Sequence, residues 1–172
     1  MARPLALAAI AGIVLAHAGA DLSACGDKFL LVGRSLRYRQ AFAAAHPSEI
    51  LAYAVPGSRL RELIKEQGFG ALLTFAGHTV RVIDGNSDLR QVLSSSRVDL
   101  VLVDPRSASD VQSRLASASS HPLLVPVVFN LSKAASANVE QQYGCVIKMP
   151  ARATEALAAI EQAIKLHDRQ SR

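Results

Sequence analysis

The sequence predicts one α/β domain in which helices cover both faces of a parallel sheet. Short apolar segments alternate with amphipathic helical patterns, as they do in α/β proteins. One of these segments, residues 98–103, is apolar on both faces apart from Asp99, as a central parallel strand must be. No linker or internal repeat divides the 172 residues, half of which are apolar, so a single core is expected.

Six apolar segments are the expected strands. Pro126 has no amide hydrogen to donate to a neighbouring strand, so the fifth strand is expected to start at or just after it. The sixth follows Gly144, which is expected to end the helix before it. The expected strands are residues 29–32, 50–54, 80–83, 98–103, 127–129 and 145–147.

Apolar residues recur at helical spacing between these strands. The first helix is interrupted by Gly68 and Gly70, so residues 71–77 are expected to form a second short helix. Ser87 and Ser132 are candidate N-caps of two further helices. The remaining two helices are expected at residues 107–120 and around Leu157, Ile160 and Ile164. The helix at 107–120 is expected to be the weakest, because few of its residues can be buried.

The first twenty residues have the order of a secretory signal peptide. Arg3 precedes an uncharged apolar run at residues 5–15, and small residues follow up to Ala20. The run is too short for a stable membrane span, although a buried N-terminal helix is the alternative. We expect cleavage after Ala20, a periplasmic or secreted location, and one mature domain at residues 21–172.

Export affects the interpretation of the two cysteines. In an oxidising compartment Cys25 and Cys145 can form a disulfide. Residues 22–25 also match the pattern that precedes the acylated cysteine of bacterial lipoproteins, so a lipid anchor at Cys25 is an alternative. The chain becomes apolar at Phe29, which leaves no flexible tether after such an anchor. Two inert thiols are the third possibility.

The order of elements from residue 50 onward resembles the receiver domain of two-component response regulators. The resemblance is carried by residues 78–105, which include the strand that ends in Asp104, and by residues 145–150, which include Lys148. It implies a doubly wound, flavodoxin-like sheet with strand order 2-1-3-4-5 over residues 49–166. The preceding residues 28–47 are then an N-terminal extension that adds an extra strand to one edge.

The same resemblance makes Asp104 the phospho-acceptor position and implies a Mg²⁺ ion held by an acidic pair after the first strand. Here that strand runs into Val55-Pro56-Gly57, which contains no carboxylate, and Asn130 replaces the expected hydroxyl residue. We therefore expect no metal and no cofactor. Asp104, Asn130 and Lys148 form a vestigial site in which Asp104 pairs directly with Lys148, while a ligand contact or phospho-acceptor role for Asp104 is the alternative.

These observations predict an exported pseudo-receiver that is not phosphorylated, is not an enzyme, and regulates an envelope protein by binding it. The alternative is a small anion-binding module with its site at the carboxyl ends of the strands. Arg34, Arg37 and Arg39 form the densest basic cluster and are either an anion or partner contact or a solvated turn. The net charge of +5 is modest and no basic groove with interleaved aromatics is present, so nucleic acid is not an expected partner.

Overall fold

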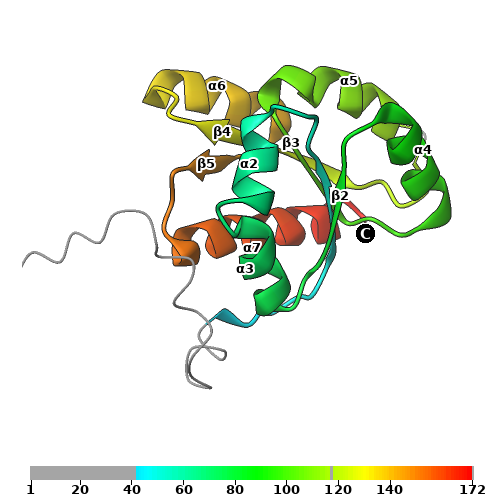
Figure 1. Cartoon of the computed structure of the whole chain (residues 1–172), viewed down its shortest axis with the longest axis horizontal. Helices are drawn as coiled ribbons and strands as arrows, with labels where there is room; N and C mark the ends of the chain where they lie inside the picture. The colour runs from blue at the N-terminus through cyan, green and yellow to red at the C-terminus, as the bar shows by residue number, and fades with distance from the viewer. Residues whose placement is uncertain (1–41, 117, 172) are drawn as a thin grey trace, which may run out of the picture.

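The computed structural model describes residues 42–116 and 118–171, and its centre is a five-stranded parallel sheet (Figure 1). The strand order is β2-β1-β3-β4-β5, which confirms the predicted doubly wound fold with order 2-1-3-4-5. The extra strand expected at residues 29–32 lies outside the described residues. The strands are β1 (Glu49–Tyr53), β2 (Thr79–Ile83), β3 (Leu100–Val103), β4 (Leu123–Phe129) and β5 (Ile147–Met149).

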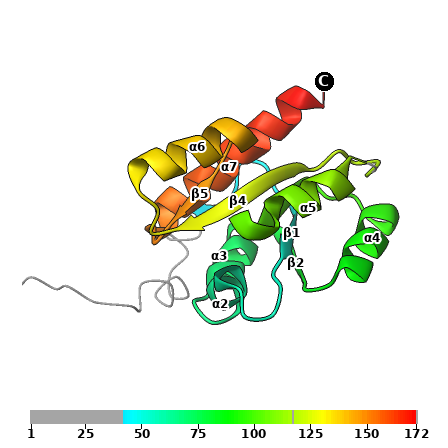
Figure 2. The same cartoon turned by 90° about the horizontal axis from the view of Figure 1, so that it is seen from above.

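Helices cover both faces of this sheet. The side chains of α2 (Arg59–Lys65), α3 (Phe69–Ala76) and α7 (Ala153–Gln170) enclose one hydrophobic cluster against the sheet. Those of α4 (Asn86–Ser95) and α5 (Pro105–Leu115), which lie side by side in Figures 1 and 2, enclose a second cluster on the opposite face. The remaining helix, α6 (Lys133–Tyr143), contacts β4.

The two clusters follow from the alternation of side chains along β1. Ile50 and Ala52 belong to the first cluster, whereas Leu51 and Tyr53 belong to the second. All four are at most 5% exposed, so β1 is buried on both faces. This double burial explains why the central strands are continuous apolar runs in the sequence.

The predicted break in the first helix is confirmed. Gly68 adopts a left-handed φ of 75° between α2 and α3. A Cβ on Gly70 would lie 3.0 Å from the carbonyl oxygen of Ile64, so a side chain at this position would force the two helices apart. The second helix begins at Phe69, two residues before the expected start.

The predicted start of β4 at or after Pro126 is wrong, because β4 begins at Leu123 and contains the proline. The amide of Leu123 donates to the carbonyl of Asp99, on the β3 side. Since successive residues alternate in direction, the nitrogen of Pro126 faces the other side, where pairing with β5 begins only at Val127. Pro126 therefore sits in the strand without breaking a ladder hydrogen bond.

Of the two predicted N-caps, the one at Ser87 is wrong and the one at Ser132 is confirmed. Gly85, not Ser87, is the N-cap of α4, because the carbonyl of Gly85 accepts the first helical hydrogen bond, from Leu89. Ser132 caps α6 as predicted, with its hydroxyl accepting from the amide of Ala135 at 3.2 Å.

Burial identifies α6, rather than the expected segment 107–120, as the helix with the smallest buried face. Helix α5 buries Ala108, Val111 and Leu115, whereas only Ser136 of α6 is buried. Helix α6 ends at Gly144, as predicted, with a left-handed φ of 77°. Within residues 42–116 and 118–171, no helix combines the length and apolar character needed to cross a bilayer.

Candidate functional site

The three predicted site residues lie along the edge at which the parallel strands end. Asp104 directly follows β3, Asn130 directly follows β4, and Lys148 lies within β5. Ligands of doubly wound sheets bind at this carboxyl edge. The other candidates, Cys25 and the cluster of Arg34, Arg37 and Arg39, lie outside the described residues and stay predictions.

The carboxylate of Asp104 is used by its own helix. Its Oδ1 accepts a hydrogen bond from the amide of Arg106 at 3.1 Å, which makes Asp104 the N-cap of α5. Pro105 follows at the first helical position, where its fixed φ suits the helix and no amide hydrogen is needed. The sequence motif Asp-Pro therefore serves as a helix start.

The predicted direct ion pair between Asp104 and Lys148 is wrong among the described residues. The Nζ of Lys148 lies 3.0 Å from Oε2 of Glu140, and both side chains are about half exposed. Helix α6 supplies this carboxylate, while the carboxylate of Asp104 caps α5. The two residues thus share a sheet edge but not a contact.

The guanidinium of Arg61 lies where the acidic pair of a receiver domain is expected. After β1 the chain continues through the buried Ala54, whose carbonyl accepts a hydrogen bond of 3.4 Å from Nη1 of Arg61. The same nitrogen donates to Oδ2 of Asp84 at 2.7 Å, and this hydrogen bond lowers the pKa of Asp84. Sequence reasoning missed this pair, although Asp84 directly follows an expected strand.

These residues do not fit the divalent cation that the receiver resemblance implies. Mg²⁺ requires oxygen ligands in near-octahedral geometry, usually including carboxylates. The side chain of Ala54 offers no ligand, and the guanidinium of Arg61 repels a cation. In the part of the chain that the structure describes, no group of three His, Cys, Asp or Glu side chains is placed to hold a metal ion.

A pocket of about 200 Å³ lies beside the predicted site, between α2, the end of β4 and the loop after β5. Of the three predicted residues, only Asn130 lines it. The guanidinium carbon of Arg59 lies 5.2 Å from the ring centroid of Phe129 at the wall of this pocket. Sequence reasoning missed Arg59, because nothing in its local pattern distinguishes it from other charges on the helix surface.

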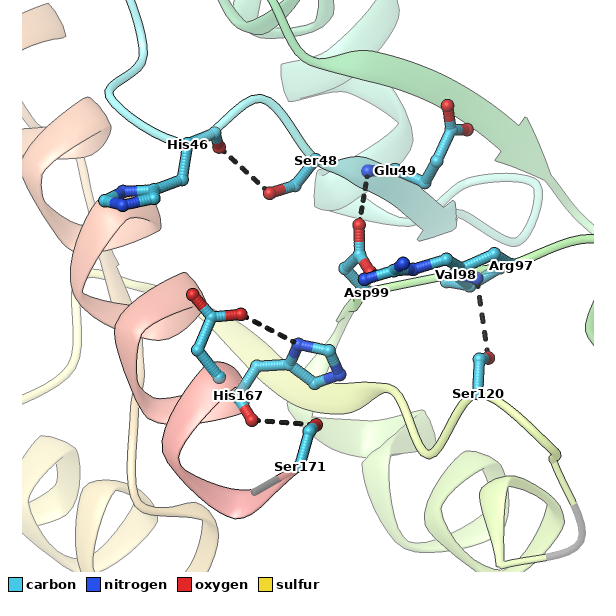
Figure 3. A network of polar contacts seen from close by, with 10 residues as sticks. His46, Ser48, Glu49, Arg97, Val98, Asp99, Ser120, His167 and Ser171 are labelled. Atoms are coloured by element: carbon cyan, nitrogen blue, oxygen red, sulfur yellow. Dashed lines mark hydrogen bonds and ion pairs between the residues drawn. The ribbon is translucent and has the colours of Figure 1, made fainter.

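The amino edge of the sheet carries a separate polar network (Figure 3). Asp99 is 8% exposed; its Oδ2 accepts from the amide of Glu49 and its Oδ1 from Nε of Arg97, both at 2.9 Å. The amide of Val98 lies 3.4 Å from the hydroxyl of Ser120. The network joins the beginnings of β1 and β3.

Two buried histidines lie near this amino edge. Figure 3 shows the ring of His167 reaching from α7 toward the network, and His78 immediately precedes β2. His78 Nδ1 and His167 Nε2 have no hydrogen-bond partner among the described residues. Burial lowers the pKa of His78, and the charge of Glu161 partly opposes this shift.

Cys145 is buried and has no disulfide partner within residues 42–116 and 118–171, and burial raises the pKa of its thiol. Its predicted partner, Cys25, lies outside the described residues. The disulfide therefore stays a prediction.

The comparisons with known proteins support the fold. No family model matches the sequence, and no curated protein is significantly similar to it. The structure is similar to the signal receiver domain of a Luxo repressor protein from Vibrio parahaemolyticus, with a TM-score of 0.54 and 13% identity, over 73% of this chain and 96% of that one. It is also similar to NtrX from Brucella abortus, solved in complex with ATP, with a TM-score of 0.56 and 16% identity.

The chain has a receiver fold. The match with NtrX covers 73% of this chain but only 28% of NtrX, so it concerns one part of that protein. Within the receiver fold, the residues described above are located by topology: Asp104 at the end of the third strand, Lys148 on the fifth, and Ala54 after the first.

Proposed function

We propose that this chain is a signal-transduction module that regulates a partner protein by binding it, without phosphoryl transfer. The observation that carries the proposal is the guanidinium of Arg61, which bonds the carbonyl of Ala54 and the carboxylate of Asp84. A positive charge at this position opposes binding of the divalent cation that phosphoryl transfer in receiver domains requires.

The capping role of Asp104 supports the same proposal. A phosphoryl group on Oδ1 would replace an acceptor that now bonds the amide of Arg106. Lys148, whose charge would otherwise stabilise a phosphorylated aspartate, is paired with Glu140. One carboxylate oxygen of Asp104 and the ammonium group of Lys148 thus take part in local structural contacts.

The direct test is incubation of the purified protein with Mg²⁺ and acetyl phosphate, followed by intact mass spectrometry. We expect no phosphate adduct, while a metal-dependent receiver domain treated in parallel becomes labelled. An acid-labile adduct that is lost in the Asp104→Asn variant would refute the proposal.

We further propose that the module is exported and acts on an envelope protein, on the basis of the signal-peptide pattern at residues 1–20. The test is the intact mass of the protein recovered from its native cells, with and without reductant. A chain that begins after Ala20 supports export, and a two-proton mass difference on reduction reports a disulfide. A chain acylated at Cys25 supports a lipoprotein, whereas a chain that retains the leader contradicts export.

The alternative function, a small anion-binding module, is favoured by one observation, the pocket beneath α2. Its position at the carboxyl ends of β4 and β5 is where parallel α/β sheets bind ligands. The pocket involves Asn130 but not Asp104 or Lys148. A ligand in this pocket would therefore contact residues other than Asp104 and Lys148.

A further inference from the structure

The pocket beneath α2 combines an apolar wall with a guanidinium. The wall is formed by Leu63, Phe129, Met149 and Ala151, of which Leu63 and Met149 are at most 5% exposed. Its volume of about 200 Å³ equals the share of roughly seven water molecules in the liquid. A small ligand fits such a space.

Arg59 is the strongest candidate for recognition of a ligand in this pocket. Its guanidinium lies over the face of Phe129, which restricts its orientation without using its N–H donors. Within residues 42–116 and 118–171 Arg59 forms no ion pair, and the carboxylate of Glu62, which also lines the pocket, accepts a hydrogen bond from Nε2 of Gln67 at 2.9 Å. The N–H donors of a guanidinium match the geometry of a carboxylate, which can accept two of them.

Asn130 provides a second polar group at the pocket. Its backbone adopts a left-handed φ of 52°, and its backbone N–H donates to the carbonyl of Met149 at 3.0 Å. This hydrogen bond connects the residue after β4 to the last residue of β5 and holds Asn130 at the pocket wall. The exposed side-chain amide is then available to a ligand as donor or acceptor.

Charge favours a monoanion over a polyanion here. Arg59 attracts an anion, but Glu62 also lines the pocket and repels any additional negative charge. The apolar wall requires the remainder of the ligand to be apolar.

We propose that this pocket binds a small monocarboxylate with an apolar body, its carboxylate on Arg59 and its body against Phe129 and Met149. Occupancy of the pocket, in place of phosphorylation, is the signal that the module transmits. This inference rests on the proposed function, since it names the input of a receiver-fold regulator.

Benzoate is the probe, with benzamide as its neutral isostere and inorganic phosphate as an anion that has no apolar body and is partly doubly charged at neutral pH. We expect benzoate to raise the Tm of the full chain in a saturable manner, and neither benzamide nor phosphate to do so. Arg59→Gln is expected to weaken benzoate binding at least about tenfold, because charge-assisted hydrogen bonds are lost. Arg90→Gln is the matched control, because Arg90 is an exposed arginine on α4, on the other face of the sheet.

Phe129→Leu provides a second variant that keeps an apolar wall but removes the ring under the guanidinium, and it is also expected to weaken binding. No saturable shift with benzoate, an equal shift with benzamide, or unchanged binding in both variants would overturn the inference. If any of these results is obtained and acetyl phosphate does not label the protein, the ligand proposal is wrong but the proposed function is still supported. Labelling of Asp104 overturns the proposed function whatever benzoate does.

Discussion

The two edges of the sheet use their polar groups in different ways. At the amino edge, Asp99 is buried, and its carboxylate joins β1 to Arg97 through two hydrogen bonds of 2.9 Å. At the carboxyl edge, the pair of Lys148 and Glu140 is about half exposed and joins neighbouring elements at the surface. The buried polar contact that fixes the strands therefore lies opposite the edge to which the receiver resemblance assigns function.

This difference has a consequence for the fold. Because the strands are joined at the amino edge and through two apolar clusters, the exposed pair of Lys148 and Glu140 contributes little to the positions of β1 and β3. The receiver fold is thus present in a chain that has no carboxylate directly after its first strand.

The largest effect is expected for Asp99→Ala. The substitution leaves the partly buried backbone amide of Glu49 without its acceptor and removes the partner of Arg97. Hydrogen bonds to charged groups contribute more than neutral ones, so the free energy of unfolding should fall by about 2–3 kcal/mol. Urea denaturation followed by circular dichroism measures the change.

Asp110→Ala is the matched control, because Asp110 pairs with Arg114 at the surface of α5. An exposed pair of this kind contributes less than about 1 kcal/mol. Equal losses in the two variants would contradict the contrast between a buried polar tie and a surface pair.

A smaller loss is expected for Asp104→Ala at the carboxyl edge. The variant removes the N-cap of α5, which typically lowers the free energy of unfolding by about 1 kcal/mol. Asp104→Asn should retain nearly full stability, since asparagine caps helices as well as aspartate does. If the asparagine variant lost as much stability as the alanine variant, the charge of Asp104 rather than its capping bond would be important.

The amino edge should also confer sensitivity to acid through His78. In the unfolded chain its ring takes up a proton near the ordinary pKa of 6.5, whereas burial lowers the pKa in the folded state. The unfolded state then binds more protons, so stability should fall as the pH decreases through and below 6.5. His78→Asn should flatten this dependence in thermal melts recorded between pH 7 and pH 5.

His121→Asn is the control for this effect. His121 is exposed and has a left-handed φ of 44°, which asparagine adopts readily. A pH dependence that flattens equally in both variants would assign the effect to histidine content in general and not to burial of His78.

The fold was predictable because its signals are local and repeated. Buried strands such as β3 are continuous apolar runs, and Gly68 and Gly144 mark helix ends by conformations that other residues avoid. The prediction was wrong at Pro126, because a missing amide hydrogen disrupts a strand only where a neighbouring strand would accept it. The nitrogen of Pro126 faces β5, whose pairing with β4 begins only at Val127.

The candidate site was less predictable because its contacts join segments that are distant in sequence. The topology places Asp104 and Lys148 on the same edge, but the choice of partner depends on side-chain positions that only packing fixes. Arg61 reaches Asp84 across 23 residues, and Arg59 reaches Phe129 across 70. No local pattern distinguishes these arginines from other charges on α2.

The smallest effect is expected for the ion pair of Lys148, which forms with Glu140 instead of the predicted Asp104. A double-mutant cycle with Lys148→Ala and Glu140→Ala should give a coupling energy of about 0.2–1 kcal/mol, because both side chains are exposed and their attraction is screened by water and salt. The parallel cycle with Lys148→Ala and Asp104→Ala should give no coupling, because the carboxylate of Asp104 bonds the amide of Arg106 instead. The opposite pattern would place Lys148 on Asp104, as in the arrangement the sequence predicts. That result would bring together at the carboxyl edge the two groups that the resemblance assigns to phosphoryl transfer.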